Sequence, residues 1–317
     1  MMKRVLALSG ALLLAAPCTQ SFAQVVWTDD GSVLGQLRQL SDFPLYELRY
    51  EAPYNVVGPI TSTSPGLSKS AFACTLFSAI DASGNRVMGR NFDWIANPVL
   101  VVITKPAGGY ASISVVDMSY PMKLADAVGW PFDGMNERGL AIGMMAIDEA
   151  KSACEVGMAS VSSFGIIRVV LDKAATVDEA IALMGKFFVT FGQIPLHYFI
   201  ADRSGASATV EYYKEELRVF RGKKPWQVST NLTFSKTPEA ERIGLCWRYA
   251  AATSILSRTD GRLGPRGAFG LLAAVSQKTT VWSSAYDLSG AKLELALGKE
   301  FAKRYNWDLK EIAGKTE

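Results

Sequence analysis

The sequence predicts an α+β protein built from stacked layers, with sheets that are mainly antiparallel. Its 317 residues are 49% hydrophobic and 20% charged, which provides a sizeable core and is unlike a disordered composition. The expected elements come in blocks, with strands first, then two helices, strands again, and finally helices and a hairpin. Blocks in this order are typical of layered α and β elements.

Each element follows from a local pattern. Short β-rich runs predict strands at 74–80, 86–91, 99–105, 111–117, 139–147, 196–201, 208–213, 217–221 and 226–230. Turn residues at 81–85 join the first two runs in a hairpin, and a closing hairpin is expected at 281–288 and 292–297. Thr176 and Glu179 form a capping-box pattern at the start of the second of four helices, which are expected at 163–175, 176–188, 239–257 and 266–277.

The first residues predict a secretory signal peptide, residues 1–23. Lys3 and Arg4 precede an apolar run at 5–16, and Ala23 provides a small residue for cleavage. The apolar run is well below the roughly 20 residues that cross a bilayer. We therefore expect an exported protein, periplasmic or secreted, without a stable membrane anchor.

Residues 24–73 are expected to be a separate segment, either a propeptide or a small N-terminal subunit. Residues 37–54 are amphipathic, and residues 60–70 are rich in Ser, Thr, Gly and Pro, as in an exposed linker that proteases reach. The character of the chain changes at Cys74, where β-rich sequence begins. Residues 74–317 are therefore predicted to form the main domain.

Charge and cysteine content limit the partners. The net charge of +3 comes from 33 basic and 30 acidic residues that are scattered along the chain, so nucleic acid is not an expected partner. Arg221, Lys223 and Lys224 are expected to form a solvated turn. After residue 23 only three cysteines remain, and the sequence leaves open whether two of them pair or stay free: Cys74, Cys154 and Cys246.

Histidine is almost absent from the sequence. His197 is the only one, and it lies in an expected strand, where a structural role is more common than a catalytic one. No HExxH pattern, paired CxxC or phosphate-binding loop is present, so neither a metal nor a cofactor is expected. A nucleophile in this chain therefore needs a base other than histidine.

Cys74 is the candidate nucleophile. If the Ala73–Cys74 bond is cut, one residue carries both the thiol and an α-amino group, whose pKa near 8 suits a base at neutral pH. The predicted hairpin returns Arg90 and Asp93 to the neighbourhood of the cysteine. A guanidinium stabilises a thiolate, and a carboxylate can orient an ammonium group. The alternative is an ordinary cysteine in a strand.

The residues around Cys74 resemble the choloylglycine hydrolase family of N-terminal-nucleophile (Ntn) hydrolases. Cys74-Thr75 is followed by Asp81, Gly84 and then Gly89-Arg90-Asn91-Phe92-Asp93. Residues 131–140, from Pro131 to Leu140, are similar to the second signature of the family. Residues 226–231, which end at Asn231, are similar to its oxyanion-hole segment, and residues 246–249 are similar to the segment that carries a second arginine, here Arg248.

The resemblance implies a four-layer αββα sandwich and a set of catalytic residues. These are Cys74, Arg90, Asp93, Asn231 and Arg248, with the backbone N–H of Ala146 as a second oxyanion donor. Ala146 stands where the family has asparagine or tyrosine, which leaves the acyl preference open, and the spacing from Asn231 to Arg248 is short for the family. Asp133 and Glu137, in the second signature, are expected to have turn and capping roles.

The implied activity is hydrolysis of a linear amide in a small N-acyl substrate through an acyl-enzyme on Cys74. Bile salts, phenoxyacetyl penicillins, N-acyl homoserine lactones and N-acyl amino acids all offer such an amide, and the sequence does not select among them. Three alternatives stay open: an acyltransferase of the same fold, an exported binding protein that is never processed, and a serine or cysteine enzyme that uses His197. The oligomeric state is also open, and a homo-oligomer is compatible with the sequence.

Overall fold

The computed structural model describes residues 5–7, 26–28, 37–41, 44–58, 73–121, 123–264 and 266–313. Most of the predicted signal peptide and the whole predicted linker at 60–70 lie outside these residues. Of the former, the structure describes only β1 (Val5–Ala7), which pairs with β2 (Val26–Thr28). No helix in the described part of the chain is both long and apolar enough to cross a membrane.

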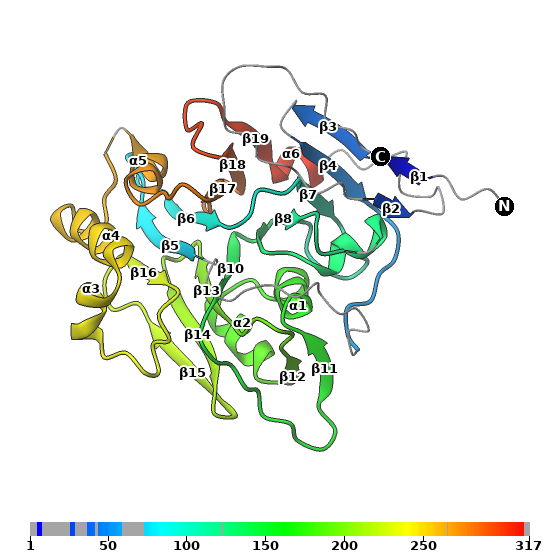
Figure 1. Cartoon of the computed structure of the whole chain (residues 1–317), viewed down its shortest axis with the longest axis horizontal. Helices are drawn as coiled ribbons and strands as arrows, with labels where there is room; N and C mark the ends of the chain where they lie inside the picture. Colours follow the sequence, from blue (N-terminus) through cyan, green and yellow to red (C-terminus); the bar gives the residue numbers. More distant parts are fainter. Residues whose placement is uncertain are drawn as a thin grey trace.

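Two large sheets form the centre of the fold (Figure 1). The first has six strands, in the spatial order β16 (Gln227–Thr230), β5 (Ala73–Ile80), β6 (Arg86–Asp93), β17 (Thr280–Asp287), β18 (Lys292–Leu297) and β19 (Tyr305–Asp308). All its neighbouring strands are antiparallel.

The second sheet has nine strands, in the order β15 (Glu216–Arg221), β14 (Ser207–Tyr213), β13 (Leu196–Asp202), β10 (Leu140–Ala146), β9 (Asp133–Asn136), β8 (Ser112–Asp117), β7 (Val99–Thr104), β4 (Leu45–Tyr50) and β3 (Leu37–Ser41). Only β4 and β7 run parallel in it. A small parallel pair, β11 (Ala159–Ser162) and β12 (Phe187–Thr190), lies apart from both sheets.

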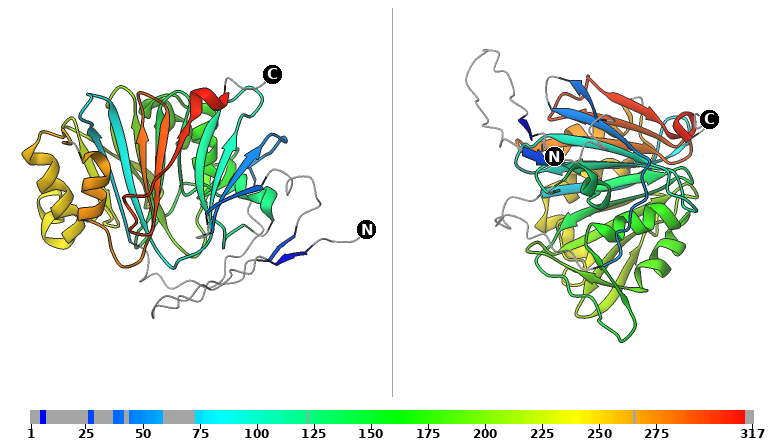
Figure 2. Two further views of the ribbon diagram at one scale, coloured as in Figure 1. Left: turned by 90° about the horizontal axis from the view of Figure 1, so that it is seen from above. Right: turned by 90° about the vertical axis from the view of Figure 1, so that its right-hand side faces the viewer.

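Helices cover the outer faces of the two sheets. Helices α1 (Gly165–Lys173) and α2 (Val177–Met184) pack on the nine-stranded sheet, and α4 (Trp247–Arg258) and α5 (Gly267–Ala274) pack on the six-stranded sheet. The yellow and orange helices lie outside the sheet that contains the cyan and orange strands (Figure 2). The two sheets contact each other through β10 and β5. The order helix, sheet, sheet, helix confirms the predicted α+β sandwich.

The predicted hairpin after Cys74 is confirmed, and it sets the geometry of the site. Asp81 accepts hydrogen bonds from the backbone N–H groups of Ser83 and Asn85, and the amide of Gly84 closes the turn on the Asp81 carbonyl. Gly84 has φ +87°, a left-handed conformation that glycine adopts without strain. The turn fixes a register in which Cys74 of β5 lies opposite Phe92 of β6.

Several helix predictions need correction. The helix expected at 239–257 is broken into a 3-10 turn (Glu239–Glu241), α3 (Arg242–Leu245) and α4, because Cys246 is extended, with φ −139° and ψ 112°. The helix from 176 is correct at its capping box, in which Thr176 accepts from the Glu179 amide. It ends at Met184, however, since the aromatic and β-branched residues that follow pair as β12.

Several further elements, β11 among them, were absent from the expectations. Part of the 131–140 segment forms strand β9, and β19 and α6 (Leu309–Ala313) follow the closing hairpin. The amphipathic stretch at 37–54 forms β3 and β4. Strand β4 is integral to the core, because Leu45 and Leu48 are fully buried and the strand pairs with β7 over six residues.

Candidate active site

Cys74 is buried at the start of β5, between the two sheets. Its Sγ atom lies 3.8 Å from Nη2 of Arg90, which comes from the neighbouring strand β6. Its backbone N–H donates to Oδ1 of Asn231 at 2.6 Å, and its carbonyl accepts from Nη1 of Arg248. Thiol, amide and carbonyl of this one residue are therefore each held by a different predicted site residue.

Asn231 and Arg248 reach Cys74 from the edge of the six-stranded sheet. Asn231 follows β16, which pairs with β5, and Arg248 lies in the first turn of α4, just after the break at Cys246. Nη2 of Arg248 donates to Oδ1 of Asn231 at 3.1 Å, and Nη1 donates to the Thr75 hydroxyl at 3.0 Å. The extended residue Cys246 ends α3, and α4 begins at the next residue. Arg248 therefore lies in the first turn of α4, where it binds β5.

Asp93 ends β6 opposite Ala73, the residue before the candidate nucleophile. Its carboxylate accepts from Nε2 of Gln277 at 2.8 Å and from the hydroxyl of Thr280 at 2.5 Å. Burial raises the pKa of Asp93, and these hydrogen bonds and the nearby guanidinium groups only partly oppose the rise. Asp93 is therefore held beside the 73–74 bond by its strand register.

Ala146 ends β10 next to Asn231, and it meets that residue through its carbonyl oxygen. Nδ2 of Asn231 donates to this oxygen at 2.9 Å. The predicted role of the Ala146 N–H as an oxyanion donor stays a prediction.

Burial also sets the state of the thiol. It raises the pKa of Cys74 above the usual value, although the Arg90 guanidinium, the Arg248 guanidinium and the Asp93 backbone N–H act in the opposite direction. In this uncut chain the thiol is therefore protonated at neutral pH. A base is needed before it can attack a carbonyl.

Residues 74–234 match the linear amide C–N hydrolases of the choloylglycine hydrolase family. The match begins at Cys74 and spans half of the chain. The chain belongs to the choloylglycine hydrolase family.

Relatives of this family member include the penicillin V acylase of Pectobacterium atrosepticum. The two chains are 28% identical over 196 residues, which is 52% of this chain and 50% of that acylase. The chain thus spans about half the length of the curated relative that it matches.

Solved structures of the family share the fold. The penicillin V acylase of Agrobacterium tumefaciens superposes with a TM-score of 0.61 at 20% identity, over 75% of this chain and 87% of that one. A variant of the conjugated bile acid hydrolase of Clostridium perfringens superposes with a TM-score of 0.58 at 16% identity, over 75% and 93% of the two chains. At these identities the likeness concerns the fold alone.

Asp133 in this family member is a site residue that the sequence interpretation missed. The expected turn role is wrong, because Asp133 is fully buried in β9 and Oδ2 forms an ion pair with Nη1 of Arg90 at 2.8 Å. The indole N–H of Trp282 donates to it at 3.1 Å, and the hydroxyl of Tyr286 also donates to its carboxylate. Glu137, by contrast, accepts from a backbone amide, that of Ala111, just before β8.

A glycine makes room for this ion pair. A Cβ atom on Gly143 of β10 would lie 2.7 Å from Leu76, 3.3 Å from Nη1 of Arg90 and 3.3 Å from Cβ of Asp133. The local signal in the sequence, Asp133 before a glycine, favours a turn. Arg90 belongs to the six-stranded sheet and Asp133 to the nine-stranded sheet. Only the packing of the two sheets shows that the carboxylate faces Arg90.

We expect Asp133→Asn to destabilise the fold by about 3–5 kcal/mol, since it leaves the guanidinium of Arg90 buried without a charged partner. Denaturant unfolding measures this change. Asp308→Asn is the matched control, because Asp308 pairs with the exposed Lys292 and its loss should cost under about 1 kcal/mol. Equal effects of the two substitutions would contradict the role assigned to Asp133.

His197 holds the segment around Asn231 in place. Its Nε2 lies 2.9 Å from the Thr230 carbonyl, and its Nδ1 lies 3.0 Å from Oε1 of Glu211. Glu211 in turn accepts from the backbone N–H groups of Phe234, at 2.6 Å, and Ser235, at 2.9 Å. Burial opposes ionisation of Glu211, but the hydrogen bonds and charge of His197 hold its pKa below the usual value.

The pair His197–Glu211 therefore fixes the chain on both sides of Asn231. The expected structural role of His197 agrees with these contacts, since both ring nitrogens have protein partners and neither contacts Cys74. Sequence inspection could not find Glu211, because its partners lie on another strand and in a loop.

We expect His197→Gln to lower kcat by about tenfold while KM changes little, because the oxyanion residue loses part of its support. Steady-state kinetics, corrected for the folded fraction, measures this. Arg168→Gln is a matched control: it disrupts another buried pair, with Asp172, that does not touch Asn231. Complete loss of activity in His197→Gln would instead favour a histidine base.

The remaining cysteines carry no disulfide in the described part of the chain. Cys154 is exposed and Cys246 is partly buried, and both are free thiols, so they are not bridged to each other.

Proposed function

We propose that the chain is an exported cysteine Ntn amidohydrolase that cuts its own Ala73–Cys74 bond and then hydrolyses a linear amide of a small N-acyl substrate. One observation carries the proposal. The Cys74 backbone nitrogen, which becomes the α-amine after cleavage, lies 2.6 Å from Asn231 Oδ1 within the cluster of Arg90, Asn231 and Arg248. The future base is thus already held beside the thiol.

The proposed self-cleavage starts at the Cys74 thiol and uses its proton. The Cys74 sulfur attacks the Ala73 carbonyl carbon, and the peptide C–N bond breaks as the nitrogen takes up a proton. A thioester of Ala73 on the Cys74 sulfur results. The α-amine is already free at this stage, because the C–N bond has broken. Water then attacks the thioester, which releases the Ala73 carboxyl group and regenerates the thiol.

Substrate hydrolysis uses the same atoms. The α-amine takes the thiol proton, the thiolate attacks the amide carbonyl, and Asn231 donates to the oxygen as negative charge develops there. The α-ammonium returns the proton to the leaving amine. Water, activated by the α-amine, then releases the acyl group as a carboxylic acid. An apolar acyl group is the substrate feature that family membership favours, and the named relatives act on penicillin V and conjugated bile acids.

Liberation of amine from a panel of N-acyl compounds tests the activity. The panel contains penicillin V, a glycine-conjugated bile salt, N-octanoyl homoserine lactone and N-octanoyl glycine. We expect hydrolysis of at least one member, and added acceptor amines should not intercept the acyl group. Capture by the acceptor would favour an acyltransferase. No turnover together with an intact 73–74 bond would favour a binding protein.

Residues 24–73 are proposed to stay bound after cleavage as a small subunit. Strand β4 is paired along all of β7, and its removal would expose the buried apolar residues of that strand to water. The indole N–H of Trp307 also donates to Glu47 of β4 at 2.7 Å. Co-elution of both fragments on native gel filtration, and their separation under denaturing conditions, would support this.

We expect the rate of self-cleavage to rise with pH. In the uncut chain no α-amine is present, and burial holds the thiol pKa above its usual value, so the thiolate fraction should grow about tenfold per pH unit below that pKa. The test refolds acid-unfolded precursor by dilution at about pH 6, 7 and 8 and follows cleavage by mass spectrometry. A rate that falls as the pH rises would contradict the assigned nucleophile.

A further inference from the structure

A cavity of about 850 Å³ lies between β15, β16 and the helices α3 and α4, and none of the predicted catalytic residues lines it. Its size is that of a small-molecule site. Its walls include four aromatic side chains and several aliphatic ones. The aromatic residues are Phe220, Trp226, Phe234 and Tyr249.

A buried arginine without an acidic partner lines this cavity. Arg242 is only 8% exposed, and its guanidinium carbon lies 3.6 Å from the centre of the Phe234 ring. Nε donates to the Thr237 carbonyl at 3.1 Å. Among the described residues, no carboxylate forms an ion pair with it, although burial of an unpaired charge is costly.

Other groups in the cavity also favour a negatively charged ligand. Lys223 and Lys224 come from the loop after β15 and have no ion pair within the described ranges, whereas Arg221 pairs with Asp178 at 2.6 Å. Glu239 is the one carboxylate among the residues that line the cavity. The basic residues near 222 are exposed, as expected for a solvated turn, and they also border the cavity that the buried arginine shares.

Unpaired buried polar atoms lie in the same walls. The indole N–H of Trp226 is a donor without a partner, and Trp226 is only 7% exposed. The Thr253 hydroxyl and Oε1 of Gln227 also lack partners in the described structure. Lys224 Nζ lies 4.8 Å above the Trp226 ring, so a cation lies close to the residue that carries the unpaired N–H donor.

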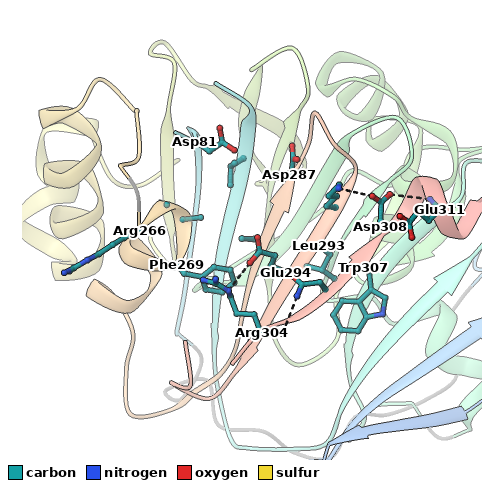
Figure 3. Close-up of a pocket in the computed structure, with 16 residues that line it drawn as sticks. Asp81, Arg266, Phe269, Asp287, Leu293, Glu294, Arg304, Trp307, Asp308 and Glu311 are labelled. Atoms are coloured by element: carbon teal, nitrogen blue, oxygen red, sulfur yellow. Dashed lines mark hydrogen bonds and ion pairs between the residues drawn. The ribbon is translucent and has the colours of Figure 1, made fainter. Parts of the chain in front are cut away.

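A second pocket offers a contrast, because its arginine is more exposed and has both an aromatic contact and a carboxylate partner. In the pocket of Figure 3, Arg304 lies over the Phe269 ring at 5.1 Å, and it forms an ion pair with Glu294 at 3.0 Å. Lys292 in that pocket pairs with Asp308 at 3.1 Å. Arg242 has the aromatic contact without the carboxylate.

We propose that the cavity around Arg242 binds a small organic anion, a carboxylate carried on an apolar chain or ring. The carboxylate would accept hydrogen bonds from Arg242 and from the Trp226 indole, and the aromatic walls would bury the apolar part. Inorganic anions lack that apolar part and would bind poorly.

Titration with octanoate, followed by NMR of the tryptophan indole N–H signals, tests the proposal on the purified full protein. The Trp226 signal is assigned by its absence in Trp226→Phe. We expect octanoate to shift this signal, and Arg242→Gln to weaken the apparent affinity by about tenfold or more. Arg304→Gln, the matched control, should leave the affinity unchanged.

Three results would overturn the proposal. The first is a Trp226 signal that does not move up to the solubility limit of octanoate. The second is an unchanged affinity in Arg242→Gln. The third is an equal shift with inorganic phosphate, which would mean that the apolar walls contribute nothing. If Arg242→Gln does not fold, the double variant Lys223→Gln/Lys224→Gln, at exposed positions, replaces it, and an unchanged affinity there would count against the site.

Discussion

Replacement of Cys74 by alanine is expected to abolish amide hydrolysis, with a loss of at least about 10⁴-fold in kcat/KM. The substitution removes the sulfur that lies 3.8 Å from Nη2 of Arg90, and the variant keeps its backbone contacts with Asn231 and Arg248. The fold should persist, because alanine fits the buried position with the loss of one sulfur atom.

Amine release from the best substrate of the panel measures this loss. Cys154→Ala is the matched control, since Cys154 is an exposed free thiol outside the site, and it should keep full activity. If Cys74→Ala hydrolysed the substrate at a rate near that of the wild type, the nucleophile would have to be another residue.

Asn231→Ala should lower kcat by about 100-fold or more, the usual effect of removing one oxyanion donor. Asn231 also anchors the Cys74 nitrogen through Oδ1, so the alanine variant removes this anchor together with the oxyanion donor. Asn231→Asp separates them, because a carboxylate keeps an acceptor for the amine and lacks the N–H donor. We expect the aspartate variant to be as slow as the alanine variant.

Asn136→Ala controls for the loss of a buried asparagine. The amide of Asn136 donates to the carbonyls of Leu171 at 2.9 Å and Ala174 at 2.7 Å, and it supports α1 away from Cys74. This variant should lose stability but keep kcat per folded molecule. Near wild-type turnover in Asn231→Ala would contradict the assigned oxyanion role.

Only part of the cluster around Cys74 could be located from local sequence alone. Cys74 and Arg90 lie on one hairpin, and the turn at Asp81 and Gly84 indicates how its strands pair. Asn231 and Arg248 were assigned only through resemblance to a family. Their contacts with Cys74 span 157 and 174 residues, a separation over which periodicity in the sequence carries no information.

The residues that were missed are held by long-range contacts. Asp133 has the local pattern of a turn, and its partners Arg90, Trp282 and Tyr286 come from both ends of the domain. Glu211 stands in a strand with polar and apolar neighbours, and only the fold places it under the amides that follow Asn231. Buried ion pairs of this kind can be recognised only after the fold shows which residue is the partner of each charge.

The layers were predicted more reliably than the element boundaries. Alternating apolar strands and a capping box indicated the α+β sandwich, and the structure confirms it. The break at Cys246 and the strand character of 37–50 were not predicted. Gly244 lies two residues before the first, but an isolated glycine within a helical pattern does not by itself predict a break. An amphipathic pattern alone does not distinguish two short strands from a helix.

Intact mass and N-terminal sequencing of the protein purified after export test the central claim most directly, with Cys74→Ala as the control. The account predicts that the wild type yields two chains, one beginning at Gln24 and one beginning at Cys74. The control should yield a single chain that begins at Gln24. A wild-type protein in which the Ala73–Cys74 bond remains intact would contradict the proposed N-terminal nucleophile.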